Sequence, residues 1–131
     1  MPSLQLDVNA SYPTERKREL AQRLGATYAQ IMRTRPETIT VAVHAHGEGN
    51  VWRCTDEEPI SSSLLMCDIR RGRSTTTRER LSRALLQVCA ETLGLDPQRI
   101  KIEYTQHAGD EMFHPQLGGF NRDWTAEEPT S

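Results

Sequence analysis

Hydrophobic and polar residues alternate in two short stretches in the first third of the chain, residues 4–8 and residues 39–43. Alternation with a period of two is typical of a strand with one buried face. Between these stretches, hydrophobic residues recur at helical spacing over residues 15–32, which predicts an amphipathic helix. This part of the chain is therefore predicted to form a strand–helix–strand unit.

The same order of elements returns after residue 62. Residues 63–69 form a nearly continuous apolar run, which predicts a strand that is buried on both faces. Residues 76–93 carry hydrophobic side chains at helical spacing, and Ile100 and Ile102 mark a further strand. A second strand–helix–strand unit is therefore predicted.

The two units are an internal repeat with an offset of 61 residues and no gap. The identical pairs include Leu4 with Leu65, Asp7 with Asp68, Leu20 with Leu81, Leu24 with Leu85, Pro36 with Pro97, Ile39 with Ile100, and His46 with His107. Two tandem β-α-β units with right-handed crossovers can share one sheet. We therefore predict an α+β fold with one four-stranded sheet, two helices on one face and a pseudo-two-fold axis.

The length of 131 residues is that of a single domain. We assign the first β-α-β unit to residues 1–46 and a linker hairpin or loop to residues 47–62. The second unit takes residues 63–107. Residues 108–131, which are rich in glycine, proline and charge, are predicted to form a C-terminal arm across the surface or a neighbouring subunit.

Both predicted helices have candidate capping residues at their N-termini. Pro13 suits the first turn of the first helix, and Ser11 or Thr14 can cap it. Thr76 and Glu79 have the spacing of a capping box for the second helix.

Composition then narrows the functional classes. Net charge is −2 and aromatic content is 5%, which argues against binding to nucleic acid or to an anionic membrane surface. No apolar run has the length of a membrane span, and no signal peptide is evident at the N-terminus. Three cysteines without a CxxC pair indicate reduced thiols, so we expect a cytoplasmic protein.

The first candidate for chemistry is Pro2. An initiator methionine that precedes a small residue such as proline is normally removed, and we assume this removal here. Pro2 would then carry a secondary amine at the end of a buried strand. Such an amine can act as an acid or a base when its surroundings disfavour the charged form. The counterpart of Pro2 in the repeat is Ser63, which has no free amine.

The second candidate is the loop after the third predicted strand. It carries Arg70 and Arg73 at positions where the first unit has Asn9 and Tyr12. Planar guanidinium groups can hold a carboxylate through two parallel hydrogen bonds. Arg71 is expected to point away from them or to pair with an acid. One half of the repeat thus offers the amine and the other offers the cations.

These features together resemble the tautomerase superfamily, and in particular its cis-3-chloroacrylic acid dehalogenase group. The resemblance lies in Pro2, in the two β-α-β units, in the Arg70-x-Gly72-Arg73-Ser74 loop, and in a Gly49-Asn50-Val51-Trp52 segment similar to a Gly-Asn-Val-Phe segment of that group. It implies a homotrimer in which Pro2 is the acid or base. It also implies that Arg70 and Arg73 bind the substrate carboxylate.

Three further positions depart from that group. Tyr28 stands where the dehalogenases have a helix histidine, and it is either an aromatic at the core edge or a hydrogen-bond partner of the substrate. Glu103, with Tyr104 beside it, stands where they have a tyrosine, and it either pairs with the arginines or lies on a solvated strand face. His114 stands where they have a water-activating glutamate, and it is a surface, subunit-contact or functional residue.

Metal binding is not predicted. His44 and His46 share one face of the second strand, but no carboxylate or third ligand is evident beside them in the sequence. We expect both histidines to pack, and we expect neither a metal nor a cofactor.

The predicted function is a tautomerase that acts on a small 2-oxo acid or its enol, such as phenylpyruvate. Tautomerisation needs one base on a carbon acid and cations on the acid's oxygens. The alternative is a hydratase, dehalogenase or decarboxylase of a small unsaturated or 3-oxo acid, such as cis-3-chloroacrylate, which needs a water-activating group. The second alternative is a non-catalytic trimeric binding protein.

Overall fold

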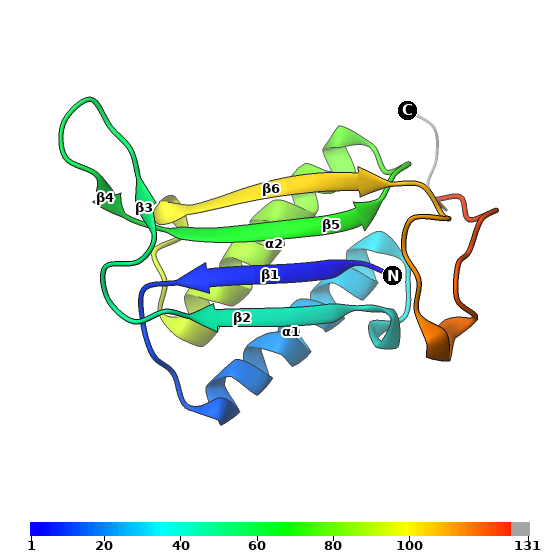
Figure 1. Cartoon of the computed structure of the whole chain (residues 1–131), viewed down its shortest axis with the longest axis horizontal. Coiled ribbons are helices and arrows are strands. Elements are labelled where there is room, and N and C mark those ends of the chain that lie inside the picture. Colours follow the sequence, from blue (N-terminus) through cyan, green and yellow to red (C-terminus); the bar gives the residue numbers. More distant parts are fainter. Residues whose placement is uncertain (127–131) are drawn as a thin grey trace.

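The structure is a computed structural model, and it describes residues 1–126. The elements in chain order are β1 (Ser3–Val8), α1 (Thr14–Met32), β2 (Thr40–Ala45), β3 (Trp52–Arg53), β4 (Ile60–Ser61), β5 (Ser63–Arg70), α2 (Thr75–Leu93) and β6 (Ile100–His107) (Figure 1). Three short 3-10 helices, η1 (Pro36–Thr38), η2 (Pro97–Arg99) and η3 (Pro115–Leu117), complete the chain path. Within residues 1–126, no helix is long and apolar enough to cross a membrane.

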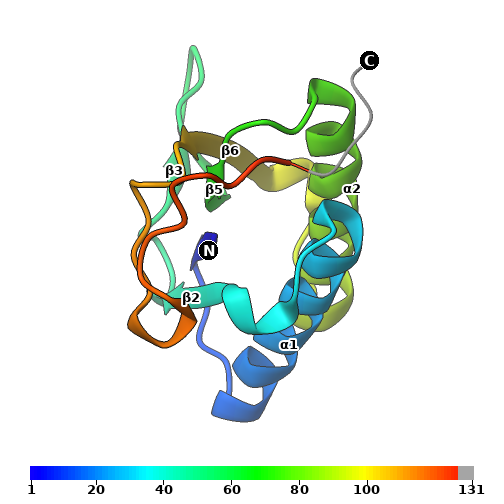
Figure 2. The same cartoon turned by 90° about the vertical axis from the view of Figure 1, so that its right-hand side faces the viewer.

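The main sheet has the strand order β2-β1-β5-β6. β1 pairs with β2 in parallel, β5 pairs with β6 in parallel, and β1 and β5 are antiparallel neighbours. Both helices lie side by side on one face of the sheet (Figure 2). The predicted α+β fold, with two β-α-β units in one four-stranded sheet, is therefore confirmed.

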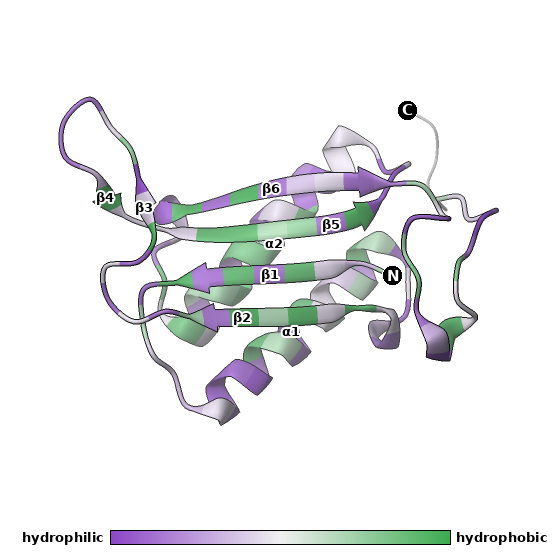
Figure 3. Cartoon of the chain, viewed as in Figure 1, coloured by the Kyte–Doolittle hydropathy of each residue, from purple (hydrophilic) through white to green (hydrophobic). Residues whose placement is uncertain are grey.

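Hydrophobic side chains fill the space between the sheet and the two helices. Alternate residues of the two central strands, including Leu4 and Leu6 on β1 and Leu65 and Ile69 on β5, are fully buried there. The hydropathy colouring shows hydrophobic residues along the strands and a largely hydrophilic loop between β3 and β4 (Figure 3). The core therefore follows the period-two pattern of the sequence.

Burial of β5 on both faces is wrong for the single chain. Leu65 is fully buried under the helices, but Leu64 and Met66 point to the opposite face and are only partly buried. Both α1 and α2 lie on the other face of the sheet, so neither covers the face of Leu64 and Met66 (Figure 2). The apolar run therefore reflects one buried face and one partly apolar open face.

The capping predictions are also wrong. Pro13 is itself the residue before α1, and no side chain caps this helix. α2 begins two residues after Arg73, and the Ser74 hydroxyl accepts a hydrogen bond of 3.2 Å from the backbone N–H of Thr77. A serine one position outside the helix satisfies an N–H of the first turn, so Thr76 is not required as a cap.

Residues 47–62 form the hairpin of β3 and β4, and the chain after β6 folds back beside the end of β5 (Figure 1). Backbone hydrogen bonds from Asn121 N–H to the Gly109 carbonyl and from Trp124 N–H to the Asn121 carbonyl fold the arm on itself. The Arg70 side chain at the end of β5 donates to the Gly109 and Asn121 carbonyls and holds the arm in this place. The arm thereby covers the end of the sheet at which β1 begins.

Candidate active site

Four of the sequence-predicted residues line one small cavity of about 20 Å³ at the start of β1. Pro2, Tyr28, Arg70 and Arg73 contribute to it. Met1, Thr34 and Trp124 complete its lining. The residues come from the segment before β1, from α1 and the turn after it, from the end of β5 and the loop after it, and from the C-terminal arm.

The antiparallel pairing of β1 with β5 brings the two halves of the site together. Ser3 pairs with Asp68, so the residue before β1 lies beside the residues that end β5. Pro2 is buried at this position, and Arg70 is 4% exposed and Arg73 8% exposed. The amine-bearing end of one repeat unit therefore meets the cationic loop of the other.

The arginine loop has a backbone that turns its two outer arginines inward. Gly72 has a φ of +126°, a backbone angle that residues other than glycine rarely adopt. Arg70 and Arg73 are buried while Arg71 is exposed, as expected from the sequence. Only the outer arginines of the loop can therefore contact a ligand in the cavity.

Arg70 is held by backbone carbonyls of the arm. Its Nη1 donates to the Gly109 carbonyl at 3.1 Å and to the Asn121 carbonyl at 3.0 Å. Within residues 1–126, no carboxylate forms an ion pair with Arg70. Burial lowers the pKa of Arg70, although an arginine remains protonated at neutral pH. Among the described residues, this buried charge is therefore held by backbone carbonyls and not by an anionic side chain.

Arg73 is held by α1 and by the arm. Its Nη2 donates to the Met32 carbonyl at 2.6 Å. The Trp124 ring lies over both guanidinium groups, with its centroid 4.4 Å from the Arg73 Cζ and 5.6 Å from the Arg70 Cζ. Cation–π contacts of this kind stabilise the positive charges, and the ring shields the guanidinium groups from water.

The electrostatics of this end of β1 disfavour a positive charge on an amine. The pKa of the Met1 α-amine falls from 8.0 to about 5, because burial disfavours the charged form and the positive charges of Arg70 and Arg73 repel it. With Met1 present, the nitrogen of Pro2 is an amide and cannot titrate. Removal of Met1 would place a free amine one residue deeper in the same surroundings.

Tyr28 lies against this cavity from α1 and is 2% exposed. Burial raises the pKa of its hydroxyl well above the ordinary value, although the charge of Arg73 opposes this shift. The group is therefore a neutral hydroxyl that can donate or accept a hydrogen bond. Both interpretations of Tyr28 from the sequence fit this position, because the residue belongs to the core and also lines the cavity.

Glu103 and Tyr104 lie outside the cavity. Glu103 is on the open face of β6 and pairs with Lys101 at 3.1 Å, so pairing with Arg70 and Arg73 is wrong. The Tyr104 hydroxyl lies 2.8 Å from the Ser82 hydroxyl and donates to the Arg78 carbonyl at 3.2 Å. Burial raises the pKa of Tyr104 to about 12. Glu103 faces solvent and Tyr104 faces α2.

His114 lines a neighbouring hollow of about 390 Å³ that also contains Met1. His107, Glu111 and Asp68 line the same hollow. The His114 side chain accepts a hydrogen bond of 3.2 Å from the Gln116 backbone N–H. Met1 lines both this hollow and the small cavity, so the two spaces adjoin at this residue.

Sequence reasoning missed two residues of the arm. Trp124 covers both arginines, and Gly109 allows the arm to approach Arg70. A Cβ on Gly109 would lie 1.9 Å from the Asn121 carbonyl oxygen and 3.0 Å from the Arg70 Nη1. The sequence showed only that a tryptophan and a glycine occur in an arm for which no helix or strand was predicted.

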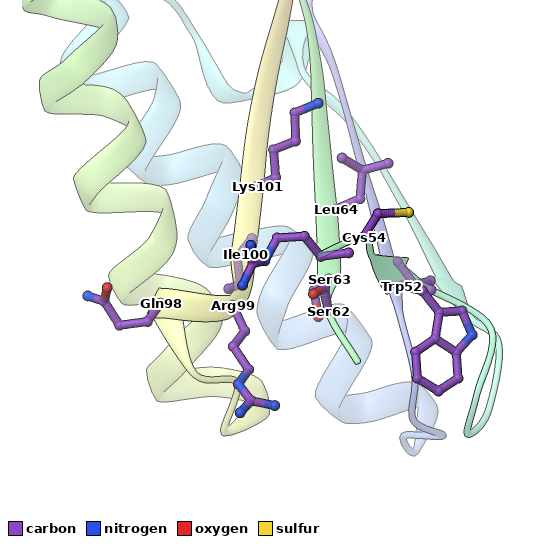
Figure 4. Close-up of a pocket in the computed structure, with 11 residues that line it drawn as sticks. Trp52, Cys54, Ser62, Ser63, Leu64, Gln98, Arg99, Ile100 and Lys101 are labelled. Atoms are coloured by element: carbon purple, nitrogen blue, oxygen red, sulfur yellow. The ribbon is translucent and has the colours of Figure 1, made fainter. Parts of the chain in front are cut away.

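A second hollow of about 360 Å³ lies at the opposite end of the sheet, between the β3–β4 hairpin and the start of β6. Figure 4 shows it with Trp52 and Cys54 on one side and Gln98 and Arg99 on the other. None of the sequence-predicted site residues lines it. The residues that could hold a metal are also outside the cavity: Asp7, His44 and His46 meet on the open face of β1 and β2.

Comparisons with known proteins agree with this geometry. The family model described as macrophage migration inhibitory factor (MIF) matches residues 1–113. A comparison with curated proteins finds no match.

Solved structures match over most of the chain. Protein N1, a member of the cis-3-chloroacrylic acid dehalogenase family, is 20% identical with a TM-score of 0.77, covering 90% of this chain and 82% of its own. Pt0534, inactivated by 2-oxo-3-pentynoate, is 18% identical with a TM-score of 0.75, and the match covers 92% of this chain and 95% of Pt0534. A fused 4-OT solved as a symmetric trimer is 17% identical with a TM-score of 0.77, and the match covers 92% of this chain and 95% of the fused 4-OT. At these identities the likeness shows the fold.

Proposed function

This chain belongs to the macrophage migration inhibitory factor family of the tautomerase superfamily, and on that premise we propose that it is a keto–enol tautomerase of a small 2-oxo acid. The observation that carries the proposal is the cavity in which two buried arginines lie beside the N-terminal end of β1. The superfamily contains isomerases and related catalysts, and 2-oxo-3-pentynoate, the compound that inactivates Pt0534, is itself a 2-oxo acid.

The proposed mechanism assigns a separate task to each part of the site. Met1 is removed, and the neutral amine of Pro2 takes the proton of the enol hydroxyl. The protonated amine then delivers this proton to the carbon next to the developing oxo group and is neutral again, and enolisation retraces the same two steps. Arg73 and Arg70 bind the carboxylate and stabilise the negative charge that develops on the oxo oxygen. The neutral hydroxyl of Tyr28 is available to hydrogen-bond an oxygen of the substrate.

Space for the substrate depends on removal of Met1. A cavity of about 20 Å³ holds roughly one water molecule and no organic acid. Met1 lines both this cavity and the neighbouring hollow of about 390 Å³. Its removal therefore frees the amine and opens the arginines to a space large enough for a small carboxylate.

Dehalogenation or hydration remains the second candidate, because the neighbouring hollow contains groups that can activate water. His107, Glu111 and His114 line it, and the Glu111 carboxylate lies 3.8 Å from the His107 Nδ1. Decarboxylation of a 3-oxo acid would use the same arginines without the water. A non-catalytic trimeric binding protein is the third candidate.

The deciding experiment compares substrates with Met-free protein, verified by intact mass. We expect measurable ketonisation of phenylpyruvate enol and little or no chloride release from cis-3-chloroacrylate. Brisk chloride release would put the dehalogenase first. Retained Met1 with no turnover of either acid would favour the binding protein.

The pH dependence of kcat/KM tests the state of the amine. Burial and the charges of Arg70 and Arg73 lower the pKa of an amine at this end of β1, to about 5 for Met1. We expect the pKa of the Pro2 amine to lie below the ordinary range of about 7.7–8.0. A base works in its neutral form, so kcat/KM should be constant above this pKa and fall as the pH drops through it.

Removal of either buried charge should shift this profile. Arg70→Ala or Arg73→Ala removes one repulsion and should move the acid limb of the kcat/KM profile to higher pH. Steady-state assays between about pH 4 and pH 9 would measure it. An acid limb near the ordinary α-amine pKa in the wild type, unmoved in the variants, would contradict the proposal.

The proposed assembly is a homotrimer. The open face of the sheet carries Leu64 and Met66, and neither α1 nor α2 covers it. The fused 4-OT structures are described as trimers. Multi-angle light scattering at micromolar concentration should give the mass of three chains, and the mass of one chain would refute this assembly.

A further inference from the structure

Three side chains with metal-binding atoms meet on the open face of the sheet, away from the arginine cavity. Asp7 comes from β1, His44 from β2, and His46 directly follows β2. The parallel register pairs Asp7 with His44, and the alternation of β2 puts His44 and His46 on one face. The ligand atoms of all three lie within 4.8 Å of one another.

The distances already approach those of a coordination shell. The Asp7 Oδ1 is 3.0 Å from the His44 Nδ1 and 2.7 Å from the His46 Nε2. Around a tetrahedral ion with bonds of about 2.0–2.1 Å, neighbouring ligand atoms lie about 3.3 Å apart. Small side-chain movements would therefore let an ion replace the two hydrogen bonds.

The charge and exposure of the cluster also suit a cation. Asp7 supplies a carboxylate and His44 and His46 supply imidazoles, which are ligand types that zinc takes in proteins. The side chain of Asp7 is 20% exposed and those of His44 and His46 are 42% and 40% exposed. In the single chain, the Asp7 carboxylate thus lies next to two imidazoles that an ion can reach from solvent.

The internal repeat supplies a matched cluster in which one ligand is missing. Asp68, Thr105 and His107 stand 61 residues after Asp7, His44 and His46. The Thr105 hydroxyl donates to the Asp68 carboxylate and lies 3.0 Å from the His107 Nε2. A neutral hydroxyl is not among the usual zinc ligands, so the second cluster offers two ligands where the first offers three.

We propose that Asp7, His44 and His46 bind a divalent transition-metal ion of the zinc class, with solvent in the remaining position. Imidazole and carboxylate ligands suit such ions, and three protein ligands leave the site open. This proposal departs from the sequence-based expectation that His44 and His46 lack a carboxylate partner. The partner is Asp7, which lies 37 residues away from His44 in the chain.

The test is zinc binding by the untagged full chain, measured by equilibrium dialysis with elemental analysis. We expect about one zinc ion per chain at micromolar free Zn²⁺. His44→Ala and His46→Ala should each weaken binding at least about tenfold, and Asp7→Asn should also weaken it. Zinc should raise the Tm of the wild type, because it binds the folded chain, and should not raise that of His44→Ala.

Two control variants separate this site from other ligands. Cys54→Ser removes the exposed thiol and should leave zinc binding unchanged. Thr105→His gives the second cluster a third ligand and should raise the stoichiometry toward two. The proposal is overturned if the wild type takes up no zinc, if the His44→Ala and His46→Ala variants bind like the wild type, or if Cys54→Ser abolishes uptake. Circular dichroism of each variant checks that the fold is retained.

Discussion

Pro2→Ala is expected to lower the kcat/KM for phenylpyruvate enol by a factor of about 10²–10⁴, the usual contribution of a general acid or base. The primary amine of alanine can keep a trace of activity if Met1 is still removed. Pro2 is buried at the start of β1, so the smaller, more flexible residue also loses the fixed position of the proton-transfer group. Steady-state kinetics of the Met-free variant would measure the loss.

A single residue added before Pro2 should be more damaging than the substitution. The nitrogen then becomes an amide, which cannot take up a proton, and the added residue occupies the space of Met1 in the cavity. Pro59→Ala, in the exposed loop between β3 and β4, is the matched control and should leave the kinetics unchanged. Full activity in the extended chain would end the proposed mechanism.

Arg73→Ala is expected to cost at least about tenfold in kcat/KM. A charged hydrogen bond contributes about 1.5–3 kcal/mol, and about 1.4 kcal/mol corresponds to a factor of ten. Arg73 is 8% exposed, so little water is available to replace it beside a bound carboxylate. Arg73→Lys should recover only part of the activity, because an ammonium group cannot form the two parallel hydrogen bonds of a guanidinium.

The neighbouring arginine provides the control for this loss. Arg71 belongs to the same loop but is exposed, so Arg71→Ala should leave kcat/KM nearly unchanged. Arg73 also donates to the Met32 carbonyl, so thermal unfolding must show that Arg73→Ala remains folded under assay conditions. Equal losses in the two variants would indicate a general charge effect and contradict direct contact with the carboxylate.

The fold and part of the site could be predicted because they depend on local patterns. Period-two alternation located β1, β2 and β6, and a nearly continuous apolar run located β5. Helical spacing located α1 and α2, and the 61-residue repeat paired the two units. The repeat also implied that Pro2 and the arginine loop belong to different halves. Antiparallel pairing of β1 with β5 then brings Pro2, Arg70 and Arg73 to one cavity.

The sequence by itself determined the elements, their order and the residue types that could carry the chemistry. The tertiary structure alone decided which of them meet: Trp124 lies over the arginines, Glu103 pairs with Lys101, and Asp7 joins His44 and His46. The physical reason is that a local pattern records which face of a segment is buried. The neighbour across that face is selected by strand register and by the path of the arm, which depend on contacts between residues far apart in the chain.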